Sequence, residues 1–399
     1  MSSNAFFANR AEALLRLHNF VPHAGRDYAA GRNSDDGPDG NNQVSKLSPY
    51  LRHRLITERE VVAAVLNQHS LTAAEKYVQE VLWRTYWKGW LEMRPDVWRR
   101  YCAERDFALQ NFLDASAIVA AEKGLTGIEG FDDWARELVE TGYLHNHTRM
   151  WFASIWIFTL RLPWTLGADF FLRHLLDADP ASNTLSWRWV AGLQTKGKTY
   201  LATAENIARY TNGRYATQGL AKSAVALTEH SIDLLQPIRE LPAHNPNTPS
   251  LLLVTHEDMN PESFITGAIK TARVAVPSHL LWGEKSAQFV HTAALDSVQR
   301  IGAHYQCDTR LDVSLDAASL LQAADEGGVK HILTAYPPVS PVADALSKAT
   351  PILAQSGITL TQVRRSWDSH FWPHAQKGFF LFKEQMAEGL ISEGVELNR

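Results

Sequence analysis

The segment "DADPASNTLSWRWV", which begins at Asp177, gathers side chains that could do chemistry into one short stretch. Asp177 and Asp179 cannot both be buried as anions without partners, so a cation or a hydrogen-bond donor must meet each of them. Arg149 is a candidate partner for one of the two carboxylates. A flat, polar heterocycle with imide and amide edges would suit the other, and the indoles of Trp187 and Trp189 would suit such a ring.

A second cluster lies in "QEVLWRTYW", where Glu80, Trp83 and Arg84 are spaced three and four residues apart. In a helix this spacing places an acid, a large ring and a fixed cation on one face. The alternative is a surface salt bridge beside a core Trp, and for this cluster taken alone the alternative is favoured.

A third cluster lies in "TGYLHNHTRMWF", where Asn146, Arg149 and Met150 also share a helical face. A satisfied buried polar network explains this pattern about equally well. The three clusters together, rather than any one of them, therefore indicate a binding site.

The composition is that of a folded protein. A chain of 399 residues can bury a large core, and this length favours two or three domains. The thirteen Trp residues are heavy usage, which is typical either of a bulky core or of proteins that stack flat ligands and bases. The two Cys residues cannot form a disulfide framework, a four-thiolate zinc site or an iron–sulfur cluster, so no metal cluster is expected.

Charge and hydropathy restrict the partners. The net charge of −4 argues mildly against nucleic acid, but the excess of acid lies in the second half of the chain. A local basic groove in the first half stays open. The N-terminus lacks the pattern of a signal peptide, and the longest apolar run, "MWFASIWIFTL", is too short to span a membrane. We expect a cytoplasmic protein without a membrane partner.

The elements that must position these clusters are predicted to be helices. Residues 58–93 place apolar residues at three and four spacing, and further helical stretches follow up to residue 177. Residues 25–51 are rich in Gly, Asn, Asp and Pro and predict an irregular loop. No convincing strand appears before residue 249, so the first part is predicted to be mainly α-helical.

The spacing of apolar residues changes after a Pro- and Asn-rich linker. The runs "LLLVTH", "ARVAVP", "HILTAY" and "ITLTQV" read as short strands that alternate with helical patterns, which predicts a parallel, doubly wound sheet. We therefore expect a helical domain over 1–230, a linker over 231–248 and a C-terminal α/β Rossmann-like domain over 249–399.

The clusters, taken in order, resemble the FAD-binding helical domain of the photolyase/cryptochrome family. The matching pieces are Tyr28, the phosphate-loop pattern "SKLSPYL", the helix with Glu80, Trp83 and Arg84, the "HNxxRM" motif from His145 to Met150, and the "DxDxxxN…WxW" motif of the opening segment. One match arises easily by coincidence, but five in order do not.

The resemblance implies that FAD is the cofactor. It places Ser45, Leu47 and Ser48 near the FAD diphosphate, where hydroxyls and backbone N–H groups favour an anion. Asn146 resembles the amide that faces flavin N5, Arg149 pairs with Asp177 over the ring, and Asp179 meets the imide edge. The set of FAD-binding residues that it implies is Tyr28, Ser45, Leu47, Ser48, Arg84, Asn146, Arg149, Asp177, Asp179 and Asn183.

The resemblance also implies an electron path. Trp187 and Trp164 match two members of the family's Trp chain, which passes an electron to the photo-excited flavin. The outermost Trp has no counterpart, because the matching region around Asn111 contains none. Its replacement was left open among four residues: Trp98, Tyr101, Trp134 and Trp156.

The function that the resemblance implies is blue-light-driven splitting of cyclobutane pyrimidine dimers in UV-damaged DNA. Glu80 would hydrogen-bond the flipped-out lesion, and Trp83 and Trp189 would hold it beside Asn146 and Met150. The alternative is a cryptochrome-type photoreceptor that signals to a partner protein through the redox state of its flavin. A third alternative is a light-independent flavoprotein, in which the Trp residues of the electron path would have no function.

Departures from the family pattern bear on this choice. His147 stands where repair enzymes carry an Arg that touches DNA, and His is a weaker, pH-dependent cation. Tyr77 and Tyr143 replace Trp near the flavin, and Thr85 replaces a second Glu. The paired lysines of "TKGKTY" supply DNA-backbone contacts or form an exposed loop, at even odds.

The order of the domains is the last departure. In the family the α/β domain precedes the helical one, whereas here "LLLVTHEDM" resembles its first strand and follows the helical domain. The resemblance therefore implies a circular permutation, and an unrelated α/β domain is the alternative. No Gly-rich phosphate fingerprint appears in this half, so nothing supports a second, antenna chromophore there.

Overall fold

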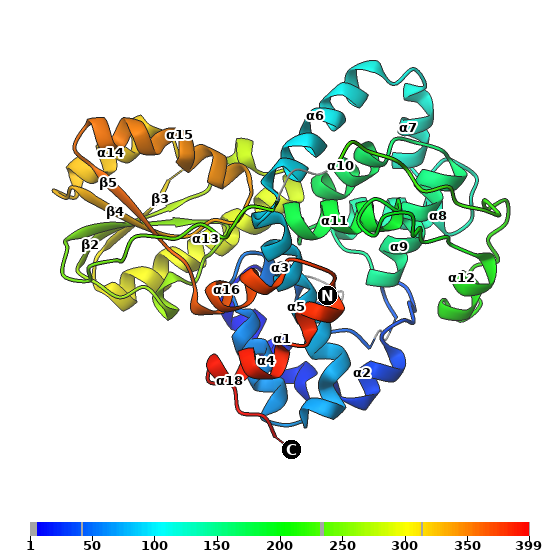
Figure 1. Ribbon diagram of the computed structural model, residues 1–399, viewed down its shortest axis with the longest axis horizontal. Coiled ribbons are helices and arrows are strands. Elements are labelled where there is room, and N and C mark those ends of the chain that lie inside the picture. Colours follow the sequence, from blue (N-terminus) through cyan, green and yellow to red (C-terminus); the bar gives the residue numbers. More distant parts are fainter. Residues whose placement is uncertain (1–5, 41–42, 232–234, 313, 399) are drawn as a thin grey trace.

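The computed structural model describes residues 6–40, 43–231, 235–312 and 314–398. A helical part comes first in the chain and a parallel sheet with its helices follows (Figure 1). This confirms the predicted fold class of a mainly helical domain plus a C-terminal α/β domain.

The described residues before the sheet form twelve α-helices of the helical part, with a short π-helical stretch, Ile155–Thr159, after α9. The helices are α1 (Arg10–Phe20), α2 (Arg26–Gly31), α3 (Ser48–Arg52), α4 (Glu58–Leu66), α5 (Leu71–Glu92), α6 (Pro95–Asn111), α7 (Ala115–Glu122), α8 (Phe131–Thr141), α9 (Asn146–Ser154), α10 (Trp164–His174), α11 (Pro180–Val190) and α12 (Ala204–Tyr210). The predicted loop over 25–51 therefore contains two short helices, α2 and α3.

Helix α5 organises this part. It begins at an N-cap serine, Ser70, whose hydroxyl accepts a hydrogen bond from the N–H of Ala73, and it ends at Glu92. It contacts α2, α4, α6 and α11. Both Glu80 and Arg84 lie on it, so one long helix places the second sequence cluster between its neighbours.

The sheet has five strands in the order β3-β2-β1-β4-β5, all parallel. The strands are β1 (Ser250–Thr255), β2 (Ile269–Ala275), β3 (Asp308–Asp312), β4 (His331–Ala335) and β5 (Thr359–Val363). The helices α13 (Glu284–Tyr305), α14 (Ala317–Glu326) and α15 (Pro341–Gln355) connect β2 to β5 in turn. Strand β1 is buried along its whole length, as a central parallel strand must be.

The chain returns to the helical part after β5. Helices α16 (Ser366–Phe371), α17 (Phe379–Lys383) and α18 (Met386–Ser392) complete it, and both α16 and α17 pack on α5. Figure 1 shows α16 and α18 beside α4 and α5, away from the sheet. The predicted domain boundary at 249 thus separates the strands from the first helices, whereas the residues after Val363 pack with the helical part.

A buried ionic network joins the two parts. The guanidinium of Arg52 donates to both carboxylate oxygens of Glu257, at 2.7 and 2.9 Å, where the chain leaves β1. Arg54 donates to both oxygens of Asp368 in α16, each at 2.7 Å. All four side chains are at most 3% exposed. Buried charges require such partners, so the network fixes which surfaces of the two parts meet.

The described residues between α12 and β1 form no helix or strand, and residues 232–234 of the predicted linker lie outside the described residues. This stretch is tied to the helical part by Glu229, whose carboxylate accepts two hydrogen bonds from Arg188 in α11, at 2.5 and 2.7 Å. No described helix is long and apolar enough to cross a membrane.

Candidate functional site

The opening motif sits where α11 begins. Asp179 is the N-cap of α11, and its carboxylate accepts a hydrogen bond of 2.9 Å from the backbone N–H of Ser182. Pro180 follows as the first helical residue, a position that needs no N–H donor. The two acids are therefore placed by a helix start, with Asp177 just outside the helix and Asp179 at its cap.

Arg149 and Asp177 form the ion pair that the sequence predicts. The guanidinium donates to both carboxylate oxygens, at 3.0 and 2.9 Å, and its Nε donates to the carbonyl of Leu144. Arg149 is 24% exposed and Asp177 only 5%. Burial alone would lower the pKa of Arg149, but Asp177 outweighs burial and raises it. The pair thus presents a fixed, permanently charged cation on its open side.

Asp179 has cations as partners as well. Its carboxylate lies 3.2 Å from Arg84 and 3.7 Å from Lys88, both on α5. Burial would raise the pKa of Asp179, but Lys88, Arg84 and Arg52 together hold it well below its usual range. Asp179 is therefore ionised at neutral pH although it is buried.

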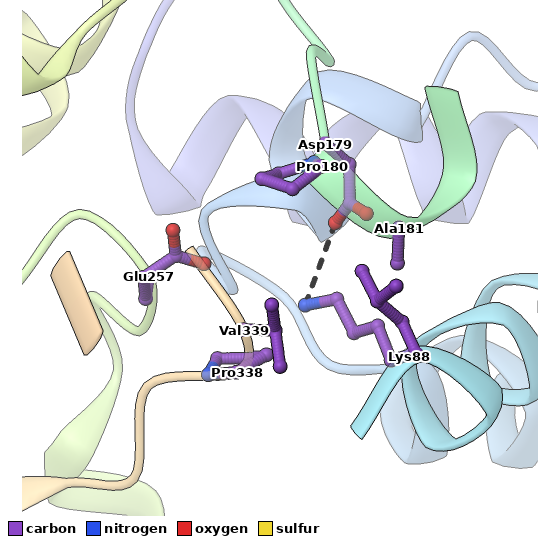
Figure 2. A pocket seen from close by; sticks show the side chains of 8 residues that line it. Lys88, Asp179, Pro180, Ala181, Glu257, Pro338 and Val339 are labelled. Carbon is purple, nitrogen blue, oxygen red and sulfur yellow. Dashed lines mark ion pairs between the residues drawn. The ribbon is translucent and has the colours of Figure 1, made fainter. Parts of the chain in front are cut away.

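Lys88 is the unusual member of this group. Figure 2 shows its ammonium directed at Asp179 beside a small cavity that Glu257 and Val339 also line. The cavity measures about 10 Å³, close to the least that holds one water. Burial, helped by the charge of Arg84, lowers the pKa of Lys88 to about 8. The sequence analysis missed this residue, because a single Lys on a helix has no distinguishing spacing.

Arg84 bridges two acids rather than standing free. Its Nε lies 3.3 Å from Glu58 of α4, and its other end meets Asp179. Glu58 itself is 2% exposed and lies between Arg54 and Arg84. The predicted flavin-site cation is thus part of the same buried charge network that joins the two parts of the molecule.

Glu80 has a partner that the sequence did not reveal. Its carboxylate accepts a hydrogen bond from the guanidinium of Arg32, which directly follows α2. Both side chains are about one third exposed. Burial raises the pKa of Glu80, and the charge of Arg32 opposes that rise. Nothing in the spacing of these two residues, 48 positions apart, indicates the pair.

Trp83 is stacked against the C-terminal segment. Its ring lies 3.6 Å from that of Phe379 of α17, and the two planes differ by only 10°. Trp87, one turn further along α5, lies 5.1 Å away. Phe379 is buried and holds the Trp83 ring in a fixed orientation. The sequence analysis placed Phe379 in a different domain and so missed it.

Trp189, the second Trp predicted to hold the lesion, stacks on Tyr200, and the two ring centres lie 5.7 Å apart. The Tyr200 hydroxyl lies 3.4 Å from Nε2 of His147, whose Nδ1 lies 3.1 Å from the carbonyl of Asn33. Burial lowers the pKa of His147, so this ring is neutral at pH 7. His147 therefore stands where the repair enzymes carry an Arg, but it does not supply the positive charge of that Arg.

The remaining predicted residues differ in their exposure. Asn146 is exposed in the first turn of α9, and Met150, one turn later, is half-buried. Ser45 is half-buried, Leu47 is buried, and Ser48 is the first residue of α3. Tyr28 is buried and packs edge-on against Tyr77 at 5.0 Å.

The two predicted electron-transfer residues are set by the packing of α10 on α11. Trp164 begins α10, and the ring of Trp187 lies against Gly167, one turn later, where an added Cβ would come within 2.3 Å of it. Asn183 strengthens this contact, because its side-chain amide donates to the carbonyl of Ala168 at 2.9 Å. The indole N–H of Trp187 is buried and has no acceptor among the described residues.

Comparison with known proteins matches residues 77–216 to the family described as the FAD binding domain of DNA photolyase. Relatives called deoxyribodipyrimidine photo-lyase include one from Streptomyces griseus, 35% identical over 40% of this chain and 35% of its own length. Another, from Alkalihalophilus pseudofirmus, is 31% identical over 47% of this chain and 39% of its own length. The chain thus spans well under half the length of these relatives.

Solved structures are also similar over about half of the chain. A bacterial class III photolyase from Agrobacterium tumefaciens is 26% identical, with a TM-score of 0.44 over 51% of this chain and 43% of its own. A cryptochrome from Synechocystis is 25% identical, with a TM-score of 0.41 over 52% of this chain and 44% of its own. Among the described residues no group of His, Cys, Asp and Glu is arranged to hold a metal ion.

The family match covers Glu80, Arg84, Arg149 and Asp177. The paired charges and aligned indoles described above therefore belong to a domain of known type. Residues 77–216 of this chain therefore form a domain that is similar to the FAD binding domain of DNA photolyase, a type of domain that takes FAD as its cofactor.

Proposed function

We propose that this protein splits cyclobutane pyrimidine dimers in UV-damaged DNA under blue light. The observation that carries the proposal is the arrangement on α5, where Glu80 and Trp83 lie one turn apart and both are partly exposed. A partly exposed acid beside a fixed aromatic face suits a flipped-out lesion, in which two linked bases of one strand are unpaired and unstacked from their neighbours. The names of the two relatives described above agree with this interpretation.

The residues present fit FAD. The buried N–H of Trp187 lacks an acceptor among the described residues, as expected of a group that faces a polar ligand. Arg149 keeps an open side although Asp177 holds it, and Asn146 is exposed on the same helix. The binding residues that we propose are Tyr28, Ser45, Leu47, Ser48, Arg84, Asn146, Arg149, Asp177, Asp179 and Asn183.

Within this set the roles divide. Arg149 and Asn146 act directly on the ring system, whereas Asp179 is oriented by Arg84 and Lys88. Asn183 holds α11 against α10 through its amide. When bound and reduced, FAD supplies on excitation the electron that opens the dimer, and recovers it afterwards.

The protein's part in repair is to hold and polarise the lesion. Glu80 would hydrogen-bond the dimer and stabilise the charge that develops on it, and Arg32 would hold the Glu80 carboxylate in place. Trp83 and Trp189 would hold the lesion, each ring being fixed by its own stacking partner. Met150 and Asn146 would line the adjoining wall from α9. Trp164 and Trp187 would return the flavin to its reduced state.

The experiment is repair of dimer-containing oligonucleotides under blue light by reduced holoprotein, for single- and double-stranded DNA. We expect restored thymines, and we expect Glu80→Ala to slow repair by about tenfold or more, equivalent to at least about 1.4 kcal/mol on the barrier. Glu75→Ala is the matched control, because Glu75 lies on the same helix and pairs with Lys383 at the surface. Repair that is unchanged by Glu80→Ala would refute the role of Glu80.

One observation favours the cryptochrome-type alternative. Because burial lowers the pKa of His147, this position offers no positive charge to a DNA phosphate at pH 7. If the reduced holoprotein repairs neither form of DNA while light still changes the redox state of its flavin, signalling to a partner protein becomes the better proposal.

A further inference from the structure

A row of aromatic rings continues outward from Trp164 through helix α6. The ring of Trp164 lies 5.6 Å from that of Tyr101, and Tyr101 lies 5.2 Å from Trp98 on the same helix. Trp98 in turn lies 5.8 Å from Trp282, in the segment before α13. Figure 1 shows α6 leaving the centre of the molecule beside α10 and α11, and α10 also contacts α13. The row therefore crosses from the helical part to the α/β part.

The inner end of this row lies on helix α10, which packs on α11, the helix that carries Trp187. Trp187 of α11 lies against Gly167, one turn from Trp164 on α10. Both indoles are buried, at 2% and 8% exposure. Buried indoles on two packed helices are suited to passing an electron, because an indole can be oxidised and can be buried without a formal charge.

The other two candidate indoles, those of Trp156 and Trp134, do not continue this row. Trp156 lies near Trp187 at 6.3 Å, but it is fully buried and its other neighbours are phenylalanines. Trp134 stacks on Trp151, and among the described residues it makes no ring contact with Trp164 or Trp187. Of the four candidates that the sequence left open, Tyr101 and Trp98 alone continue the line from Trp164.

Tyr101 is poorly suited to remain oxidised, that is, one electron short. Its hydroxyl is buried without an acceptor among the described residues, so an oxidised Tyr101 could not release its proton. The guanidinium of Arg105 lies 6.0 Å from the ring centre and opposes a further positive charge there. Burial also raises the pKa of this phenol well above its usual value. Tyr101 therefore serves as a bridge between two indoles.

Trp282 is suited to be the outer end. Trp98 is only 3% exposed, whereas Trp282 is partly exposed, so an oxidised Trp282 can pass its indole proton to water. The residue lies before Gly283, whose Cα sits so close to the Arg173 carbonyl that an added Cβ would fall 1.8 Å from its oxygen. This close approach fixes the segment that carries Trp282 against α10.

We propose that Trp98 and Trp282 extend the electron supply of the flavin site, with Tyr101 as a bridge. One electron passes from Trp282 to Trp98, across Tyr101 to Trp164, and then to Trp187, which replaces the electron given to the excited flavin. Trp282 is left one electron short and releases its indole proton to water. A soluble thiol then returns one electron and one proton to it. This inference rests on the proposed function, because it concerns how the same flavin is reduced.

The test is photoreduction of the FAD-loaded protein in the presence of a thiol, followed by the absorbance of oxidised flavin. We expect Trp98→Phe and Trp282→Phe to slow photoreduction by about tenfold or more, which corresponds to a rise of about 1.4 kcal/mol in the activation barrier. Trp134→Phe removes a comparable buried indole outside the row and should leave the rate unchanged. Tyr101→Phe keeps a ring in the bridge and should change it less than threefold, about 0.6 kcal/mol.

A second readout does not depend on the photoreduction rate. Without thiol, peptide mass spectrometry after illumination should find oxidised tryptophan at Trp282, and at Trp98 in the Trp282→Phe variant. FAD content and thermal melting of each variant show that it has folded. The proposed route would be overturned if Trp98→Phe were photoreduced at the wild-type rate, or if oxidation were concentrated at Trp156. The role of Tyr101 as a bridge would be overturned if Tyr101→Phe slowed photoreduction as much as Trp98→Phe does.

The two proposals fail separately. Protein whose flavin is reduced chemically does not need the row of rings, so Trp98→Phe should repair dimers at the wild-type rate after such reduction. If the pre-reduced wild-type protein does not repair dimers, the proposed function is wrong, whereas the photoreduction and oxidation-mapping results still decide the electron route.

Discussion

Asp179 stays ionised inside the protein because Arg84 and Lys88 lie on either side of it. The sequence indicated that this acid needs a positive partner, and it proposed a flavin edge as the second neighbour. The residues that surround it come from α5, nearly a hundred positions earlier, so no local pattern could reveal Lys88. Arg32 beside Glu80 was missed for the same reason, whereas chemistry indicated Arg149 as the partner of one of the two acids and the family resemblance indicated Asp177 as that acid.

The first residue-scale prediction concerns Asp177. Asp177→Asn removes the anion that holds Arg149 by two hydrogen bonds, and it leaves a half-buried cation without its partner. We expect FAD affinity to fall by about tenfold or more, because a charged, bidentate contact is worth roughly 1.5–3 kcal/mol. Titration of the apoprotein with FAD measures this loss. Asp96→Asn, at a surface ion pair on α6, is the control.

The second concerns pH and Lys88. Its pKa is about 8 in the folded protein against a usual 10.5, so between these values the unfolded chain binds more protons than the native one. This residue therefore contributes a stability that rises with pH across that window. Compared with Lys88→Met, the wild type should gain unfolding free energy as pH increases from about 8 to about 10. Denaturant unfolding at several pH values tests this, and a constant difference between the two proteins would contradict it.

Among the elements, helices α10 and α11 approach most closely at a glycine. A Cβ on Gly167 would lie 2.3 Å from the Trp187 ring and 2.9 Å from that of Trp156. Helix propensity alone would favour Ala at this position. The residue is therefore explained by packing, and it fixes where the Trp187 ring lies. The sequence predicted both helices from their apolar spacing, but this pattern gives no information about the distance between them.

Gly167→Ala should destabilise the protein by roughly 1–3 kcal/mol, because the surrounding rings are too large to yield easily. It should also displace Trp187 and slow photoreduction. Gly378→Ala is a matched control, since nothing lies within 4 Å of a Cβ there. Thermal unfolding and flavin photoreduction are the measurements, and an unchanged melting temperature for Gly167→Ala would contradict the close approach.

The strands show the same limit of sequence reasoning. Four of the five strands were predicted from apolar runs, and β3 was missed. Strand β3 lies at the edge of the sheet, is polar, and has no fully buried residue among Asp308–Asp312. An edge strand pairs on one side only and is not sandwiched between helices, so the apolar signal that identifies the central strands is absent.

At the scale of the whole molecule, the helical and α/β parts are joined by buried charges. Arg52 and Glu257 meet at the carboxyl end of β1, and Arg54 lies 3.4 Å from the neighbouring Asp258. The sequence predicted two separate domains, because composition and period change near residue 249. It could not show that α16, α17 and α18 return to α5, since their short apolar patterns fit either part. That the α/β part is a permuted family domain stays a prediction.

Arg52→Met should destabilise the protein by roughly 3–5 kcal/mol, because Glu257 would remain buried without its cation. The double variant Arg52→Met/Glu257→Met removes both charges and should recover much of the loss. Denaturant unfolding of the four proteins in the cycle gives the coupling energy between the two residues. If the double variant is as unstable as the sum of the single ones, the pair contributes nothing through its mutual contact.

The stacking of Trp83 on Phe379 has a consequence for how the protein acquires its structure. One ring belongs to α5 and the other to α17, and the whole sheet lies between them in the sequence. Helices α1–α12 can form locally while the ribosome is still working, but this ring pair closes only after the sheet has been made. Contacts so distant along the chain slow folding. The contact of Trp83 with Phe379 is therefore expected to form late in folding.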